Sequence, residues 1–143
     1  MKITEVIYSN SSTAQNDIKY LTGFDAPDPV LLINTPTVKI LFVPAMEKGR
    51  AISEVYENIQ VISFSDIKMP KKSKLKISNY ILEILKKRKI KKIKIDKNFP
   101  VEMYLALTNE IQISVGELSV RNQRRKKSRD ELNKLYACQK ITS

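Results

Sequence analysis

The sequence has 143 residues, 42% of them hydrophobic, which is enough for one domain with a continuous core. It contains no histidine and one cysteine, Cys138, so it lacks the commonest general base and metal ligand and cannot form an internal disulfide. Most hydrolase mechanisms are thereby excluded within these residues, while the net charge of +11 raises the question of a polyanionic partner. The longest apolar runs, residues 30–33 and 40–43, are too short to span a membrane, and no signal peptide follows Met1, so we expect a cytoplasmic protein.

The first part of the chain predicts a strand, a polar connection and a hairpin. Residues 3–8 are β-rich, and residues 9–17 form a polar, turn-prone stretch. Two apolar runs, 30–33 and 38–43, are separated by Asn34-Thr35-Pro36-Thr37, which favours a tight antiparallel hairpin inside a sheet.

The middle of the chain predicts a short helix, a strand and a longer amphipathic helix. Residues 45–56 are compatible with a helix interrupted at Gly49, and residues 60–64 read as a strand. A second helix, with Ser73 as its expected N-cap, follows a solvated connection. Its apolar stripe consists of Ile77, Tyr80, Ile81, Ile84 and Leu85.

The last part predicts a strand with one wet face over residues 92–95 and a helix opened by Pro100 and Glu102. That helix is expected to pack through Val101, Met103, Leu105 and Leu107, and an alternating strand follows with Ile111, Ile113 and Val115. A basic linker, residues 121–127, then precedes a capping box at Ser128 to Glu131. Because this helix begins just before Ser143, we expect the natural polypeptide to continue.

This order of elements predicts a three-layer α/β sandwich on a mixed β-sheet of about six strands, with helices on its faces. A terminal helix is expected to lead away from the sheet.

Three motifs in chain order resemble the N-terminal domain of the creatinase, prolidase and aminopeptidase P family. Asp17 to Phe24, D-I-K-Y-L-T-G-F, is similar to the family motif N-I-x-Y-L-T-G-F, and Pro44 to Ala51 is similar to its V-P-x-x-E-x-x-R-A stretch. The third motif is the linker into the family's catalytic domain, R-x-x-K-s-x-x-E, and it is matched here by Arg124, Lys127, Ser128 and Glu131, with Leu132 and Ala137 following.

The resemblance implies a domain with a ribonuclease H-like motif over residues 1–122, and a linker with the start of a helix over residues 123–143. It implies a parent metallopeptidase that cleaves bonds next to proline in short peptides. Two divalent ions, manganese, cobalt or zinc, would be held by Asp, Glu and His in a later pita-bread domain, and this chain would supply no ligand and no catalytic residue. The family's N-terminal domain helps form a homodimer and lines the approach to the active site. That role would fall to the segment Tyr20, Leu21, Thr22, Gly23 and Phe24.

The sequence departs from the family pattern at three places. Asp17 stands where Asn is usual, and Lys126 stands where the linker is normally apolar. The usual N-terminal helix is missing, so we expect one face of the sheet to be barer.

A structural interpretation of residues 20–24 competes with the functional one. Gly23 would supply a backbone geometry closed to other residues, while Tyr20 and Phe24 pack under the loop.

Two further functions were weighed from the charged residues. Scattered acids at turns could be ligands for two-metal chemistry, but short acidic side chains at such places usually cap backbone groups. The basic clusters, residues 86–97 and 121–129, could form a phosphate-binding stripe. No aromatic residue is interleaved with these clusters for base stacking, which counts against nucleic-acid binding. A stand-alone basic module that binds nucleic acid or an acidic protein is therefore kept as the alternative function only. The acids are Asp17, Asp25, Asp28, Asp66 and Asp96, and the stripe would join Lys91, Lys92, Lys94 and Lys97 to Arg121, Arg124, Arg125 and Lys126.

Overall fold

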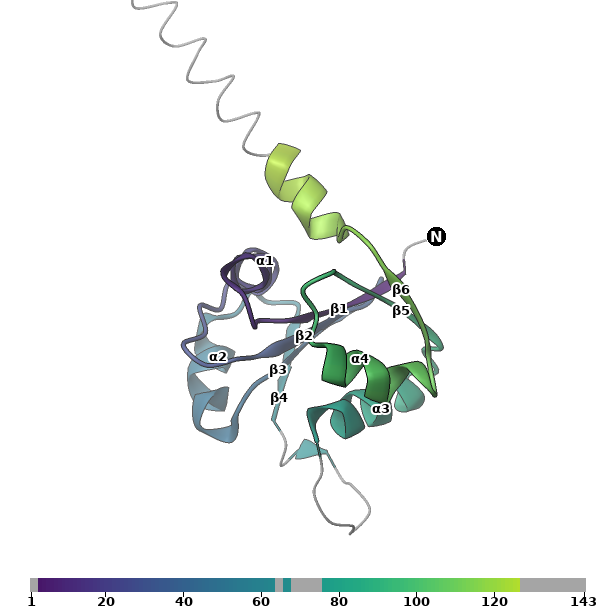
Figure 1. Cartoon of the computed structure of the whole chain (residues 1–143). Coiled ribbons are helices and arrows are strands. Elements are labelled where there is room, and N and C mark those ends of the chain that lie inside the picture. The colour runs from purple at the N-terminus through teal and green to yellow at the C-terminus, as the bar shows by residue number, and fades with distance from the viewer. Residues whose placement is uncertain (1–2, 64–65, 68–75, 127–143) are drawn as a thin grey trace, which may run out of the picture.

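The structure, a computed structural model, describes residues 3–63, 66–67 and 76–126. Its strands are β1 (Thr4–Tyr8), β2 (Leu31–Asn34), β3 (Lys39–Phe42), β4 (Ile59–Ile62), β5 (Lys92–Ile95) and β6 (Gln112–Val115). Its helices are α1 (Ser12–Thr22), the 3-10 turn η1 (Ala45–Glu47), α2 (Lys48–Glu54), α3 (Ile77–Lys87) and α4 (Val101–Thr108). A further helix covers residues 119–126 and leads away from the sheet (Figure 1).

The six strands form one mixed sheet in the order β4-β3-β2-β1-β5-β6. Strand β2 is antiparallel to both of its neighbours, β1 and β3, while β4, β5 and β6 each join a parallel neighbour. The predicted hairpin is therefore confirmed, with Thr35 closing its turn through hydrogen bonds to Val38. The predicted α/β fold on a mixed sheet is confirmed as well.

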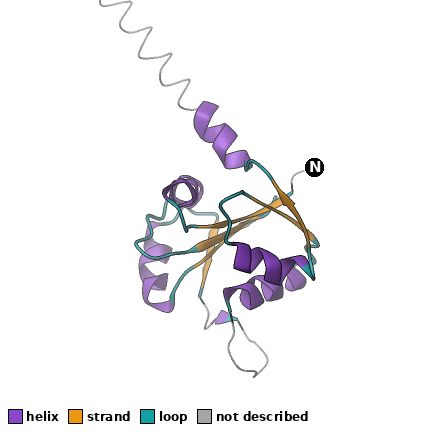
Figure 2. Ribbon diagram, viewed as in Figure 1, coloured by secondary structure: helices purple, strands orange, loops and turns teal. Residues whose placement is uncertain are grey.

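Helices cover both faces of the sheet (Figure 2). Because side chains alternate along a strand, Val6 and Ile33 face α3 and α4, while Ile7 and Leu32 face α1 and α2. Each face thus has its own apolar core. Among the described residues, no helix is both long enough and apolar enough to cross a bilayer.

One end of the face that carries α1 and α2 is polar. Strand register places Lys39, Asn34, Glu5, Lys94 and Ser114 side by side in a row across five strands. The next row, which contains Leu41, Leu32 and Ile7, belongs to the apolar core. A cavity of about 420 Å³ lies over the polar row, so the sheet is barer at this end.

The structure corrects the expectation that residues 9–17 form turns. Residues 12–22 are helical, because the Ser11 side chain accepts a hydrogen bond from the Ala14 amide and caps the first turn. Ala14 and Ile18, four residues apart, bury one helix face. The many Ser, Thr and Asn residues of this segment hid the helix from the sequence pattern.

Smaller corrections concern the other helices. The predicted packing of α4 through Met103 and Leu107 is confirmed, with Tyr104 added to it. Val101 and Leu105 were predicted to pack but are 69% and 58% exposed, because α4 is apolar on several sides. The helix interruption lies before Lys48 rather than at Gly49. The expected N-cap Ser73 and the capping box at residues 128–131 lie outside the described residues, and α3 begins after Lys76.

The end of α3 adopts a left-handed geometry at a residue with a side chain. The Ile90 amide donates to the Leu85 carbonyl, and the Lys89 amide donates to the Lys86 carbonyl, which is the Schellman arrangement. Lys89 occupies its αL position with φ 58°, a position that usually holds glycine.

We expect Lys89→Gly to raise the free energy of unfolding by about 0.5–1 kcal/mol, because glycine removes the αL strain at this position. Urea unfolding followed by circular dichroism measures the change. Lys87→Gly, inside the same helix, is the matched control and should lower stability by about 1 kcal/mol. A Lys89→Gly variant no more stable than the parent would contradict this account of the helix end.

Candidate functional site

The segment Tyr20 to Phe24 forms the end of α1. The buried Thr22 hydroxyl donates to the Ile18 carbonyl at 2.7 Å and accepts from the Phe24 amide at 3.1 Å. The Thr22 carbonyl accepts from the Tyr56 amide at 2.9 Å, which ties the helix end to the segment after α2. The threonine is therefore fully engaged in fixing the chain reversal.

Gly23 and Phe24 complete this reversal. Gly23 has φ +83°, and its amide donates to the Lys19 carbonyl, so it is a left-handed C-cap. Phe24 is fully buried, and the Arg50 guanidinium lies 4.9 Å from its ring centroid.

The structural interpretation thus accounts for Thr22, Gly23 and Phe24. Tyr20 and Leu21 differ from them, because both are half-buried and pack at the margin of the apolar core. Tyr56, which is 59% exposed, packs against Gly23 of the same chain reversal. Tyr20, Leu21 and Tyr56 therefore contribute accessible apolar surface at this end of α1.

The helix of residues 119–126 corrects the expectation of a basic linker. Arg124, the first residue of the linker motif, lies within this helix, whereas Lys127 and Glu131 lie outside the described residues. Leu118 and Val120 are fully buried and join the apolar core beneath α1. After Val120 every described residue is polar, and only Arg121 and Arg124 among them are partly buried.

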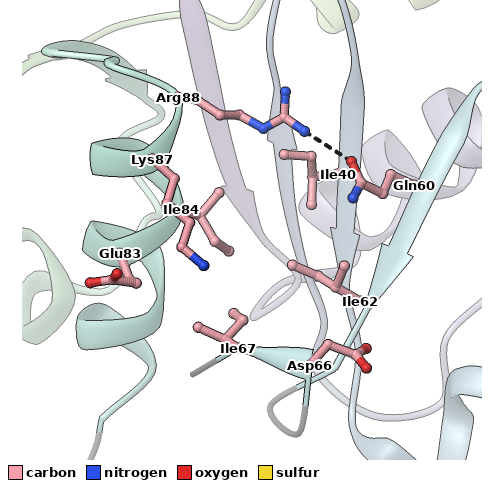
Figure 3. Close-up of a pocket in the computed structure, with 9 residues that line it drawn as sticks. All are labelled: Ile40, Gln60, Ile62, Asp66, Ile67, Glu83, Ile84, Lys87 and Arg88. Carbon is pink, nitrogen blue, oxygen red and sulfur yellow. Dashed lines mark hydrogen bonds between the residues drawn. The ribbon is translucent and has the colours of Figure 1, made fainter. Parts of the chain in front are cut away.

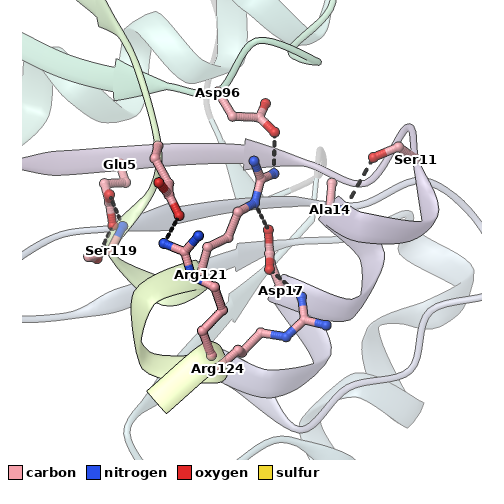
Figure 4. A network of polar contacts seen from close by, with 10 residues as sticks. Glu5, Ser11, Ala14, Asp17, Asp96, Ser119, Arg121 and Arg124 are labelled. Atoms are coloured by element: carbon pink, nitrogen blue, oxygen red, sulfur yellow. Dashed lines mark hydrogen bonds and ion pairs between the residues drawn. The ribbon is translucent and has the colours of Figure 1, made fainter. Parts of the chain in front are cut away.

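A network of buried charges holds this helix to the domain (Figure 4). The Asp17 side chain is fully buried, and it accepts from Arg121 Nε at 3.2 Å and from Arg124 Nη1 at 2.6 Å. Arg121 also donates to Asp96, which follows β5. Glu5 of β1 accepts from the Ser119 amide at 2.8 Å and from the Ser119 hydroxyl at 2.6 Å.

Each contact in the network has a clear electrostatic reason. Glu5 places its carboxylate at the N-terminus of the helix, where free amides and the helix dipole favour a negative charge. Arg121 and Arg124, three residues apart, project from one helix face toward Asp17. Burial lowers the pKa of the Arg121 guanidinium, but its hydrogen bond to Asp96 and the charge of Asp17 outweigh burial and raise that pKa overall.

The structure brings together two of the acids that appeared scattered in the sequence. Asp17 and Asp96 meet at Arg121, which neutralises them as an ion-pair partner. Within the described part of the chain, no group of three or more His, Cys, Asp or Glu residues could hold a metal ion. Because arginines already pair with Asp17 and Asp96, these two acids do not fit the two-metal chemistry that was weighed for the scattered acids.

The proposed phosphate-binding stripe loses part of its charge to the same contacts. Arg121 and Arg124 pair with Asp17, and Arg125 pairs with Glu117. Lys91, Lys92 and Lys97 remain exposed on the surface.

A second cavity, of about 440 Å³, lies between β4 and α3 (Figure 3). Ile40, Ile62 and Ile84 form its apolar wall, and Arg88 spans it to donate to the Gln60 side chain at 2.9 Å. Asp66 lies at its rim, where the hydrogen bond from Lys48 and that from the Ser63 amide hold the pKa of its carboxyl below the usual range. Arg88 and Gln60 are thus engaged with each other, and Asp66 is engaged with Lys48 and Ser63.

Sequence reasoning missed Glu5, Ser119 and Arg121 as members of one network. The available signal was the carboxylate of Glu5 between Ile3 and Ile7, its apolar neighbours on the same strand face, because such a charge needs a partner. The partner is 114 positions away, which no local pattern reveals.

We expect Arg121→Met to lower the free energy of unfolding by roughly 3–5 kcal/mol, because it leaves the buried charge of Asp96 without its partner and removes one of the two partners of Asp17. Arg125→Met is the matched control on the same helix. Its ion pair with Glu117 is exposed, so its loss should cost at most about 1 kcal/mol. Denaturant unfolding gives both values.

Adding Asp17→Asn and Asp96→Asn to Arg121→Met should restore part of the lost stability, since no buried charge is then unpaired. Equal effects of the two arginine substitutions would contradict the assigned role of Arg121.

We expect Gly23→Ala to lower the free energy of unfolding by about 1–2 kcal/mol, because alanine is strained at φ +83°. The added Cβ would also lie 2.8 Å from Tyr56 Cε1, so Tyr56→Ala in the same chain should relieve the contact but not the backbone strain.

Gly49→Ala is the control, because nothing lies within 4 Å of its added Cβ. It should leave stability unchanged or raise it by up to about 1 kcal/mol. A Gly23→Ala variant as stable as Gly49→Ala would show that the αL cap does not matter.

Comparison with known proteins gives one family. The sequence profile of the creatinase/prolidase N-terminal domain matches residues 10–125. A search of curated proteins gives no match.

Solved structures of similar fold agree with this family. An aminopeptidase P (Xaa-Pro aminopeptidase) from Streptococcus thermophilus superposes with a TM-score of 0.62 at 17% identity, covering 85% of this chain and 85% of that chain. A prolidase from Pyrococcus horikoshii OT3 gives 0.62 at 18% identity, covering 85% and 30%. An X-prolyl aminopeptidase from Caenorhabditis elegans, described as a cytosolic enzyme with a di-nuclear active site, gives 0.60 at 10% identity, covering 85% and 21%. The chain thus spans less than a third of the last two, and these identities show the shared fold alone.

Proposed function

This chain belongs to the family of creatinase and prolidase N-terminal domains, and on that premise we propose that it is the non-catalytic N-terminal domain of a metallopeptidase that cleaves bonds next to proline. The family match over residues 10–125 is the observation that carries the proposal. The solved structures of similar fold support it, because they are named as prolidases and Xaa-Pro aminopeptidases.

Catalysis in this proposal belongs to a further domain of the same polypeptide. The Pyrococcus and Caenorhabditis chains extend far beyond the part that this chain covers, and the latter is named for its di-nuclear site. Two divalent ions, manganese, cobalt or zinc, would be held by Asp, Glu and His ligands there. Residues 1–122 would form the accessory domain, and residues 123–143 would lead toward the catalytic one.

The accessory domain would supply contact surfaces and limit access to the active site, and it would supply no catalytic group. We assign to it a share in a homodimer contact and in limiting access to short proline-containing peptides. The surface that supports this role is the end of α1, where half-buried Tyr20 and Leu21 precede Gly23 and the exposed Tyr56 packs against that glycine. A cytoplasmic location is consistent with the description of the Caenorhabditis enzyme as cytosolic.

The alternative, a stand-alone basic module for nucleic acid or an acidic protein, receives less support. Arg121, Arg124 and Arg125 are engaged with acids of their own domain, so they are not available to phosphates without breaking those pairs.

The expected result is that this chain hydrolyses no Xaa-Pro dipeptide or tripeptide, with or without added Mn²⁺ or Co²⁺. The longer protein read from the same frame should release the first residue from such peptides and lose that activity with a chelator. Free amino acid released from Xaa-Pro and matched Xaa-Ala peptides measures both. Turnover by the 143-residue chain, or a reading frame that stops at Ser143, would contradict the proposal.

A further inference from the structure

The direction of the helix at residues 119–126 depends on charge rather than on apolar packing. Leu118 and Val120 anchor its first turn in the core, but no apolar residue follows them within the described helix. Packing at one end alone would leave the helix free to pivot about that end. The contacts that restrain this pivoting come from Arg121 and Arg124.

The restraining acids lie on three separate elements of the domain. Glu5 belongs to β1, Asp17 to α1, and Asp96 follows β5. Glu5 holds the N-terminal end of the helix, while Asp17 and Asp96 hold its flank (Figure 4). Contacts to three separate elements, made at Ser119, Arg121 and Arg124, restrain both the position and the tilt of the helix.

Breaking these contacts would destabilise both the domain and the helix of residues 119–126. The Asp17 side chain is fully buried, and the hydrogen bonds that the structure gives it come from Arg121 and Arg124. Moving the helix away would leave its charge without compensation in a low-dielectric site. The domain therefore restrains the helix, and the helix stabilises α1.

We propose that Glu5, Asp17 and Asp96 form an orientation clamp, in which Glu5 holds Ser119 while Asp17 and Asp96 hold Arg121 and Arg124, and which makes the helix of residues 119–126 a rigid extension of the sheet. The clamp fixes the direction in which the chain leaves the domain at residue 126. Its significance rests on the proposed function, because a fixed exit direction would set how the accessory domain sits relative to a following catalytic domain. Arg121 and Arg124 are thus positioning residues.

Distances between pairs of spin labels test the clamp in the 143-residue chain itself, with Cys138→Ser as background. The distance from a label at Lys126 to one at Ser53 or Asn109 measures the position of the helix relative to the domain. The Ser53–Asn109 distance measures whether the domain itself is unchanged. Each of these residues is exposed. Narrow Lys126 distributions are expected for the unmodified clamp.

Asp17→Asn combined with Asp96→Asn should widen the Lys126 distributions at least twofold and leave the Ser53–Asn109 pair unchanged. Glu117→Gln is the matched control, since it removes the exposed ion pair of Arg125 on the same helix and should change neither. The inference would be overturned if the Lys126 distance distributions were equally wide in the unmodified clamp and in the double variant. It would also be overturned if they were already broad with the clamp unmodified.

If the double variant alters the Ser53–Asn109 pair, the domain itself has been disturbed, and Arg124→Gln carries the test in its place. This substitution leaves the contacts of Arg121 intact, so wider Lys126 distributions support the clamp and unchanged ones refute it. No step of the measurement depends on peptidase activity. A failed clamp therefore leaves the proposed function standing, and a parent without peptidase activity leaves the clamp standing.

Discussion

The buried carboxylate of Asp17 is the constraint on which the two ends of this domain depend. A charge inside a helix that packs on a sheet is costly unless oppositely charged groups reach it, and Arg121 and Arg124 do so from more than 100 positions away. The first helix and the last described helix are therefore stabilised together. Asp96, after β5, and Glu5, in β1, also bind the helix of residues 119–126, so that the sheet, α1 and this helix form one unit.

The family motif around residues 20–24 fixes the other end of α1 to the rest of the domain. Thr22 and Gly23 turn the chain sharply at the end of α1, and the Tyr56 amide fastens that turn to the segment after α2. A motif that marks the family is thus explained in large part by backbone geometry. Backbone geometry does not explain Tyr20 and Leu21 of this motif, and these two residues are the ones proposed to contact another molecule.

A domain built in this way suits an accessory role. Asp17, Asp96 and Glu117 form ion pairs with Arg121, Arg124 and Arg125 of the helix at residues 119–126. What such an arrangement can supply is a rigid body with a defined exit direction and an apolar margin at the end of α1. Those are the properties by which a domain orients and shields chemistry carried elsewhere on a polypeptide.

The sequence by itself determined the mixed sheet, the hairpin at residues 30–43, the stripe of α3 and the family, because these depend on local periodicity, turn chemistry and contiguous motifs. It did not reveal α1, whose polar composition resembles a turn until Ser11 is seen capping it. It also could not choose the buried side of α4, which is apolar on several sides. The clamp was decided by tertiary structure alone: strand order brings Glu5 and Asp96 beside α1, and pairing between charges so distant along the chain leaves no local pattern to read.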